Sequence, residues 1–99
     1  MTTTVKLIHI GDIHGHLVGR MHLRDDSDYG KHLGGLARLY SKIAEVRSRA
    51  DDSLLINTGD TIQGSAEALF TRGAALVEVL NQFGIDFFAP GNWDFVYGT

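Results

Sequence analysis

The 99-residue sequence contains no cysteine, so the chain has no disulfide, no thiolate nucleophile and no zinc–thiolate site. It has one proline and no apolar run of the ~20 residues that a membrane-spanning helix needs. Its net charge is −3, so it lacks the basic surface that would hold a nucleic acid or an anionic membrane. These absences predict no nucleic acid and no membrane as partners. They also leave only oxygen and nitrogen atoms as metal ligands.

The N-terminal residues do not have the pattern of a signal peptide, in which a basic segment precedes an apolar one. As written, the sequence therefore predicts a cytoplasmic chain. With 43% hydrophobic and 21% charged residues, it has the composition of one globular domain at most. A single α/β layer of this size would have difficulty covering both faces of its sheet. We therefore expect residues 1–99 to be a fragment of a domain, without an internal boundary.

Three short apolar runs, each stopped by a glycine or a proline–glycine pair, have the features of strands. They cover residues 5–10, 53–58 and 85–89. The first is β-branched and mostly apolar, which predicts a strand buried on both faces. In the third, Phe87 and Phe88 are expected to belong to the core.

Two segments between these runs have the periodicity of amphipathic helices. Apolar residues recur at helical spacing over residues 36–46 and again over residues 76–83, where Gly84 is the expected C-cap. The charged segment 20–31 is interpreted as a solvated loop. Strands that alternate with helices favour right-handed crossovers. The predicted fold class is therefore α/β, with a parallel βαβαβ layer.

Each expected strand runs directly into a short polar element next to a glycine. Asp12 and His14 follow the first strand, Asp60 the second and Asn92 the third. Because the carboxyl ends of parallel strands lie at one edge of a sheet, these side chains can converge there. Such ligands suit Mn, Fe, Zn or Mg, and two ions bridged by Asp60 would generate a hydroxide nucleophile and clamp a phosphoryl group. The pattern predicts metal-assisted ester hydrolysis.

These elements resemble conserved blocks of a known family, the calcineurin-like metallophosphoesterases. Its first three blocks resemble Asp-Ile-His-Gly at 12–15, Gly-Asp at 59–60 and Gly-Asn at 91–92. Residues 9–15, 34–38 and 57–60 are similar to the 5′-nucleotidase branch in particular, so the resemblance covers nearly the whole chain. It implies the first half of a four-layer α/β/β/α sandwich. It also implies a hydrolase of nucleotide catabolism whose family members are often periplasmic or secreted.

The resemblance further implies a role for each candidate residue. Asp12 and His14 would bind the first of two divalent metal ions, Asp60 would bridge both, and Asn92 would bind the second and contact the substrate. The ions would be of the Mn, Zn, Fe or Mg class. A metal-bound hydroxide would then attack the phosphorus of a small phosphate monoester or nucleotide. Asp12, His14 and Asp60 are therefore the expected catalytic residues.

The sequence departs from the family at the residue after Asn92. The family usually has a histidine there, which contacts the substrate and helps the leaving group, whereas this chain has Trp93. An indole only donates hydrogen bonds and cannot transfer a proton at neutral pH. A tryptophan in this place resembles the related thiosulfohydrolases of sulfur oxidation, which are the alternative function. Trp93 is expected to bind substrate, with packing beneath the cleft as the other interpretation.

A second departure concerns the rest of the metal site. The remaining ligands of the family are histidines far downstream, and no histidine follows His32 in this chain. We therefore expect an incomplete metal site and no activity from these 99 residues alone. A third possibility is a truncated folding or interaction module that self-associates through its exposed sheet edge or face.

Simpler interpretations of the candidate residues stay open. Asp12 could cap a turn beside a surface histidine at position 14, and Asn92 could be a turn residue in the left-handed conformation. His16 belongs to a loop and receives no role. For His9, within the first strand, a hydrogen-bonded core position is expected rather than catalysis.

Overall fold

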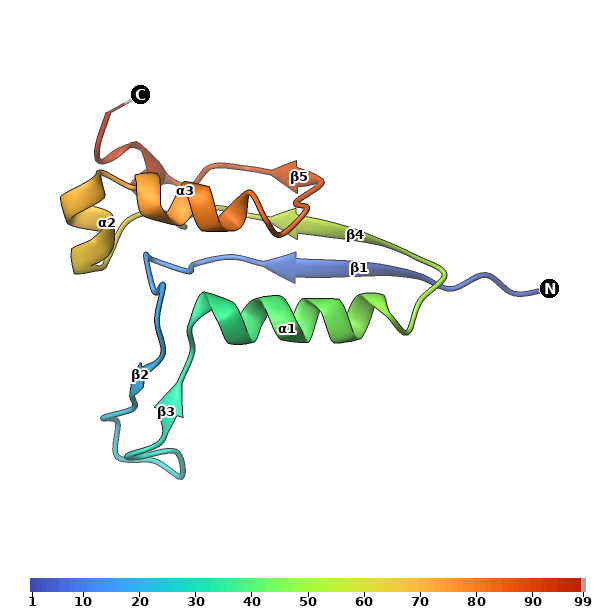
Figure 1. Ribbon diagram of the computed structural model, residues 1–99, viewed down its shortest axis with the longest axis horizontal. Helices are drawn as coiled ribbons and strands as arrows, with labels where there is room; N and C mark the ends of the chain where they lie inside the picture. The colour runs from blue at the N-terminus through green and yellow to red at the C-terminus, as the bar shows by residue number, and fades with distance from the viewer. Residues whose placement is uncertain (99) are drawn as a thin grey trace.

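The computed structural model describes residues 1–98 as a sheet with helices and a small hairpin (Figure 1). Along the chain the elements are β1 (Val5–Ile10), β2 (Arg20–Met21), β3 (His32–Leu33), α1 (Leu36–Arg47), β4 (Asp52–Asn57), α2 (Ala66–Thr71), α3 (Ala74–Leu80), β5 (Phe87–Phe88) and the 3₁₀ helix η1 (Asn92–Phe95). The molecule is flat, with principal extents of 50, 39 and 20 Å.

The central sheet has the strand order β1-β4-β5, and both neighbouring pairs are parallel. In the register of the first pair, Ile8 lies opposite Leu55 and Ile10 opposite Asn57. The third strand pairs through only two residues, so it is shorter than the predicted 85–89. The parallel α/β layer predicted from the sequence is confirmed.

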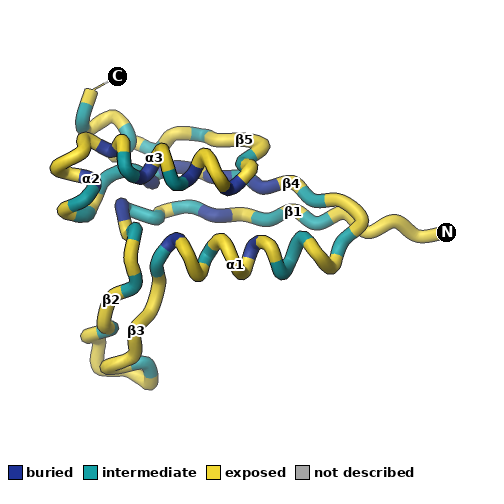
Figure 2. Tube along the Cα trace, viewed as in Figure 1, coloured by how far each residue is buried: buried dark blue, intermediate teal, exposed yellow. Residues whose placement is uncertain are grey.

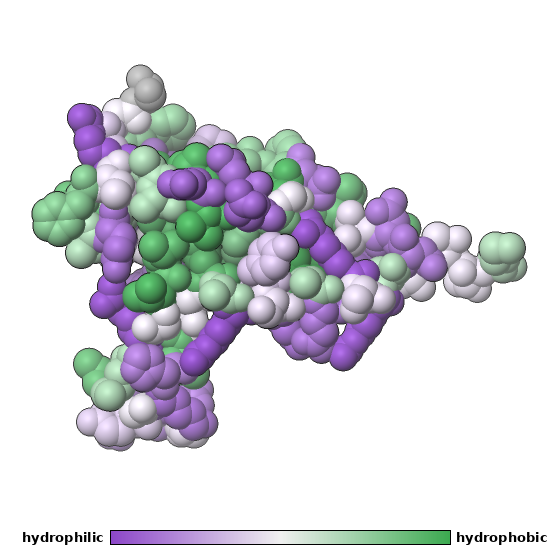
Figure 3. Space-filling view, viewed as in Figure 1, coloured by the Kyte–Doolittle hydropathy of each residue, from purple (hydrophilic) through white to green (hydrophobic). Residues whose placement is uncertain are grey.

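The hydrophobic core lies between the sheet and the helices on one of its faces. The side chains of Ile8 and Ile10 from β1 and Leu55 from β4 share a cluster with residues of both longer helices and of the turn after α3: Leu36, Ile43, Leu76, Leu80 and Phe83. Figure 3 shows apolar side chains gathered in the middle of this view, between α3 and α1. Removal of this apolar surface from water stabilises the two layers against each other.

The opposite face of the sheet is uncovered, which corrects two expectations. Leu7 and Leu54, paired across β1 and β4, are 70% and 46% exposed, so β1 is not buried on both faces. Phe87 and Phe88 are 61% and 44% exposed and do not belong to the core. Successive side chains of a strand point to opposite faces, and the helices pack on only one of them, which explains the exposure of Leu7, Leu54 and Phe87. Phe88 is next to Phe87 and lies on the other face, but β5 is a two-residue strand at the edge of the sheet, so its side chain is only partly covered.

Helix α1 agrees with its predicted range, whereas the second helical region differs. Helix α3 ends at Leu80 and its C-cap is Asn81, so the C-cap expected at Gly84 is wrong. Gly84 follows in the next turn, where it has a left-handed φ of 65°. The guanidinium of Arg47 donates to the carbonyl oxygens of Phe83 and Gly84, which fixes this turn to the end of α1. The sequence analysis did not predict helix α2, whose first turn is capped by the side chain of Ser65 accepting from the Ala68 amide.

The charged segment 20–31 is not a simple loop. Its flanks pair as the antiparallel strands β2 and β3, and this hairpin projects from the carboxyl-terminal end of the sheet (Figure 1). Figure 2 shows only exposed and intermediate residues along it, so the expected solvation holds while the expected absence of strands is wrong. Within residues 1–98, no helix has both the length and the apolar character required to cross a membrane.

Candidate metal centre

Three of the four candidate ligands meet at the carboxyl-terminal edge of the sheet. One ligand atom from each of Asp12, His14 and Asp60 lies within 4.8 Å of the others. His14 Nε2 is 3.6 Å from an oxygen of Asp12. Asp12 is exposed, whereas His14 and Asp60 are half-buried. The convergence expected from the parallel strand order is therefore present for these three side chains.

The backbone conformation of these three residues is unusual. Asp12, His14 and Asp60 have positive φ angles of 52°, 48° and 52°, and only Arg72 shares this property among the other non-glycine residues described. Such angles are uncommon outside glycine because the Cβ is crowded, although Asp, Asn and His tolerate them best. Observed left-handed residues often mark functional sites, since a locally unfavourable conformation persists only where its surroundings enforce it.

Backbone hydrogen bonds between the loop after β1 and the loop after β4 hold these residues in the left-handed conformation. The amides of Asp12 and His14 donate to the carbonyl oxygens of Gly59 and Asp60, both at 2.9 Å, and Gly15 continues the series by donating to Thr61. The loop after β1 therefore runs beside the loop after β4 as a short extension of the parallel ladder. These main-chain hydrogen bonds fix the positions of the three candidate ligands relative to one another.

Asn92, the fourth candidate, is exposed at the start of η1. The amide of the next residue, Trp93, donates to Asp60 Oδ1 at 3.1 Å, so the beginning of η1 lies against the Asp60 carboxylate. Gly91 fits there because it has no side chain: a Cβ at this position would collide with Asp60 Oδ1. The structure thus brings the third loop to the same edge as the first two.

Sequence reasoning missed Asp94, which connects these loops. Its carboxylate accepts hydrogen bonds from the amides of Asp60, Thr61, Ile62 and Gly91 at 2.8 to 3.1 Å. Burial raises the pKa of Asp94, but the bonds from these amides outweigh it and hold the pKa below its usual value. One sequence signal was present, because an acidic residue three positions after a glycine is typical of the first turn of a helix.

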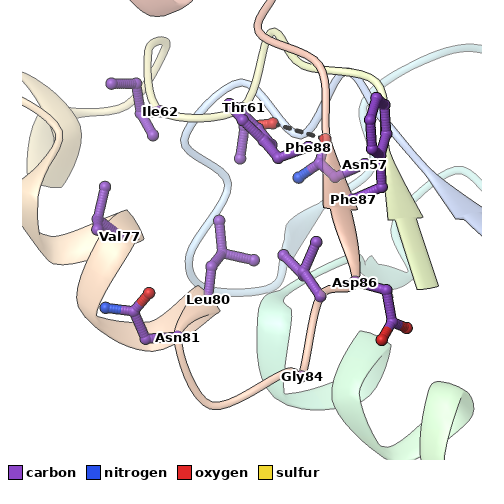
Figure 4. A pocket seen from close by; sticks show the side chains of 11 residues that line it. Asn57, Thr61, Ile62, Val77, Leu80, Asn81, Gly84, Asp86, Phe87 and Phe88 are labelled. Carbon is purple, nitrogen blue, oxygen red and sulfur yellow. Dashed lines mark hydrogen bonds between the residues drawn. The ribbon is translucent and has the colours of Figure 1, made fainter. Parts of the chain in front are cut away.

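The buried side chain of Asn57, the last residue of β4, stabilises the same loop. Its Oδ1 accepts from the Gly59 amide at 2.8 Å and from the Thr61 hydroxyl at 3.0 Å, and both Asn57 and Thr61 are fully buried. Figure 4 shows this pair at the wall of a cavity of about 510 Å³ between α3 and β5. The cavity is lined mainly by apolar side chains and lacks Asp12, His14 and Asn92, so it is separate from the candidate metal centre.

The remaining histidine and tryptophan positions are outside the core. His9 is exposed on the uncovered sheet face, and its Nε2 forms a 2.8 Å hydrogen bond with Thr58 Oγ1, so the core position expected for it is wrong while the hydrogen bond is present. His16 is exposed in the first loop. Trp93 is 46% exposed, which disfavours a purely packing role.

The donor set fits a divalent metal ion of the kind that the fold implies. Two carboxylates and one imidazole, held on main-chain turns with no thiolate nearby, match the preference of Mn, Fe, Zn and Mg for oxygen and nitrogen ligands. The proximity of two carboxylates also costs free energy by charge repulsion, which a cation between them would offset. The arrangement is therefore chemically suited to cation binding.

Comparison with known proteins identifies the class of protein that this fold and site represent. Residues 5–99 match the family described as calcineurin-like phosphoesterase, so the chain belongs to that family. The 5′-nucleotidase of Rattus norvegicus is 30% identical over 96% of this chain, and the snake venom 5′-nucleotidase of Gloydius brevicauda is 32% identical over 95%. These matches cover only 17% and 16% of those proteins, so the chain spans about one sixth of their length.

A solved structure supports the fold assignment. It is a "Putative 5'-Nucleotidase" from Staphylococcus aureus in complex with alpha-ketoglutarate, with a TM-score of 0.74 and 25% identity. The superposition covers 98% of this chain and 19% of that one. The three-strand parallel sheet and its helices therefore match the N-terminal half of a metallophosphoesterase, which confirms the expected fold class.

Proposed function

We propose that the full-length protein hydrolyses small phosphate monoesters, with 5′-nucleotides as the first candidate for its natural substrates, and that residues 1–99 form the N-terminal part of its catalytic domain. The observation that carries the proposal is the meeting of Asp12, His14 and Asp60 within 4.8 Å in a chain of the calcineurin-like phosphoesterase family. The relatives named 5′-nucleotidase favour this substrate class over other phosphate esters.

In this proposal, Asp12 and His14 would hold the first of two divalent ions, Asn92 would hold the second, and Asp60 would be a ligand of both. Manganese and zinc are the first candidates because both accept mixed carboxylate, amide and imidazole ligands. When bound, a pair of such ions supplies a nucleophile at neutral pH and neutralises the charge on the phosphoryl oxygens. The protein's part is to fix the ligand positions, which the main-chain bonds between the first two loops support.

The contribution of Trp93 is proposed to be binding without proton transfer. Its indole N–H can donate to a substrate oxygen, but it holds no proton that could be given to a leaving group at neutral pH. Aryl phosphates, whose leaving groups need no acid, should therefore be cleaved faster than 5′-nucleotides, although 5′-nucleotides are the proposed natural substrates. The incomplete ligand set leads us to propose that the 99 residues alone do not catalyse the reaction.

The test is hydrolysis of AMP and of an aryl phosphate by the metal-loaded full-length protein, compared with the Asp60→Asn variant. We expect measurable turnover that falls at least about 100-fold on substitution, because such a change weakens a ligand to both ions. Asp86→Asn is the matched control, since Asp86 also accepts a hydrogen bond from a backbone amide, but from that of Leu55 within β4 and not from the Asp60 loop. Equal losses in both variants would contradict the assignment.

One residue favours a second candidate function. Trp93 in place of the usual histidine is the reason to test a thiosulfohydrolase, which would use the same four ligands on a sulfur–oxygen centre. Release of sulfate from a thiosulfonate substrate, with little phosphate release from AMP, would favour this second function over the first.

A further inference from the structure

The Asp94 carboxylate accepts four hydrogen bonds from backbone amides. Oδ1 accepts from Thr61 at 2.8 Å and from Ile62 at 3.1 Å, while Oδ2 accepts from Asp60 and from Gly91, both at 2.8 Å. Two donors on each oxygen use nearly the full accepting capacity of an ionised carboxylate. The side chain is half-buried, which strengthens these bonds relative to a solvated position.

Three of the donors are consecutive amides, at positions 60 to 62, that point toward one place. Successive amides arranged in this way form a concave site that attracts anions. In this chain a carboxylate of its own, delivered from η1, occupies that place. The loop after β4 is therefore closed around Asp94, and its amides are not free to bind a phosphate group.

The same contact fixes two candidate ligands relative to each other. Asp94 belongs to η1, the same short helix that starts with Asn92, and it holds the main chain of Asp60 directly. A second bond returns from η1, because the Trp93 amide donates to Asp60 Oδ1. The main chain and the side chain of Asp60 are thus both attached to the segment that carries Asn92.

We propose that Asp94 is a positioning residue that sets the divalent cation affinity of the site by holding the Asp60 loop against η1. This inference rests on the proposed metal centre of Asp12, His14, Asp60 and Asn92, and it assigns a role to a residue that binds neither the cation nor the substrate. Its effect is transmitted through the position of the Asp60 carboxylate and of Asn92.

The hydrogen bonds of the Asp94 carboxylate predict the order of cation affinity among variants at this position. In Asp94→Asn, one acceptor oxygen becomes an NH2 group that faces two amide donors, so the loop must move away from η1. In Asp94→Glu, the negative charge and both acceptor oxygens remain, but they lie one methylene further from the main chain. The glutamate variant should therefore keep part of the function that the asparagine variant loses.

The experiment measures Mn²⁺ binding to the full-length protein by competition with a chromophoric chelator, below the melting temperature of every variant. Replacement of groups that orient metal ligands typically costs about 10- to 100-fold in metal affinity, and we expect a loss in this range for Asp94→Asn. Asp94→Glu should recover at least half of that loss on a logarithmic scale. At saturating Mn²⁺, the turnover of Asp94→Asn should return to within about tenfold of the wild type.

Asp86→Asn is again the control. Asp86 Oδ2 accepts from the Leu55 amide at 2.8 Å, so its loss removes a comparable side-chain-to-backbone bond from within β4, outside the Asp60 loop. We expect this variant to lower the melting temperature while leaving the Mn²⁺ affinity within about twofold of the wild type. A purely structural role for Asp94 predicts instead that both variants change the affinity alike, and that outcome overturns the inference.

The remaining outcomes separate this inference from the proposed function. A wild-type protein that binds Mn²⁺ but cleaves no phosphate ester overturns the proposed function and leaves the comparison of Asp94→Asn with Asp86→Asn intact. A wild-type protein that takes up neither Mn²⁺ nor Zn²⁺ overturns both. Asp94→Glu with an affinity no better than that of Asp94→Asn shows that the carboxylate is not the operative group, which also overturns the inference.

Discussion

Asp12 and Asp60 have the same left-handed backbone conformation, each with a φ of 52°, at the ends of two neighbouring parallel strands. Their carboxylates also come within the same 4.8 Å cluster. Both features oppose folding, since a left-handed non-glycine residue and two adjacent negative charges each cost free energy. The chain keeps them where cation binding is the proposed function, and this predicts a conflict between stability and binding.

We expect Asp12→Gly to unfold at a higher temperature than the wild type while losing most of its Mn²⁺ affinity. Glycine removes both the backbone strain and the negative charge. Little is lost with the carboxylate, because it forms no close hydrogen bond within the described residues, and His14 Nε2 is 3.6 Å from it. Asp12→Ala is the control, because it removes the carboxylate and keeps the strain. By thermal denaturation without metal, the glycine variant should exceed the alanine variant by about 1 kcal/mol. Equal stabilities would show that the φ of 52° is not strained.

The ligand set of this chain predicts weak, incomplete metal binding by residues 1–99 alone. The proposed ligands are four side chains, those of Asp12, His14, Asp60 and Asn92, and the sequence contains no histidine after His32 to complete the binding of a second ion. Elemental analysis after dialysis should find less than one tightly held Mn or Zn per chain, and aryl phosphate hydrolysis should not exceed the metal-only background. Two retained ions per chain would contradict this prediction.

The uncovered sheet face predicts that the isolated chain self-associates. Leu7 and Leu54 lie side by side on it, and contiguous exposed apolar surface of this kind promotes contacts between molecules. In a four-layer metallophosphoesterase this face would contact the second sheet. The double variant Leu7→Lys and Leu54→Lys should shift the chain toward the monomer in sedimentation velocity experiments.

The double variant Ala37→Lys and Ala44→Lys is the matched control for that prediction. Both residues are exposed on α1, so the two added charges are the same but the sheet face is unchanged. This control should sediment as the unmodified chain does. A monomeric unmodified chain at concentrations of tens of micromolar would contradict the prediction.

The sequence predicts the position of Asp12, His14 and Asp60 well because that position follows from topology. Each residue comes directly after a strand, and parallel strands bring their carboxyl ends to one edge. The same reasoning brings η1, with Asn92, to this edge, and the Trp93 amide on Asp60 is consistent with it. Helix α1 was also predictable, since twelve residues with a regular apolar stripe exclude most other structures.

Two features were not predictable from the sequence, for different physical reasons. The exposure of Leu7 and Phe87 depends on which sheet face the helices cover. A mostly apolar strand sequence does not show whether one or both of its faces are buried. The contacts of Asp94 are to four backbone amides, and amides are present at nearly every position. Its place three residues after Gly91 indicates the first turn of a helix, but not that three of these amides belong to the loop after β4.

Trp93→His tests what the unusual residue after Asn92 does in the full-length protein. If the indole supplies no proton to the leaving group, introducing an imidazole provides an acid whose contribution is typically about 10²- to 10⁴-fold. Turnover of AMP, which has a poor leaving group, should therefore rise more than turnover of an aryl phosphate, whose leaving group departs without help. The measurement is the ratio of kcat/KM for the two substrates in the variant and the wild type.

Trp93→Phe is the control for this last prediction, because it keeps an aromatic ring at the 46% exposed position and removes the indole N–H. We expect it to lower both activities by a similar factor and to leave their ratio unchanged. An unchanged ratio in Trp93→His as well would exclude an acid role at this position. If Trp93→His instead abolishes hydrolysis of a thiosulfonate while phosphate release stays low, the indole serves a sulfur–oxygen substrate, and the residue after Asn92 then separates the two functions.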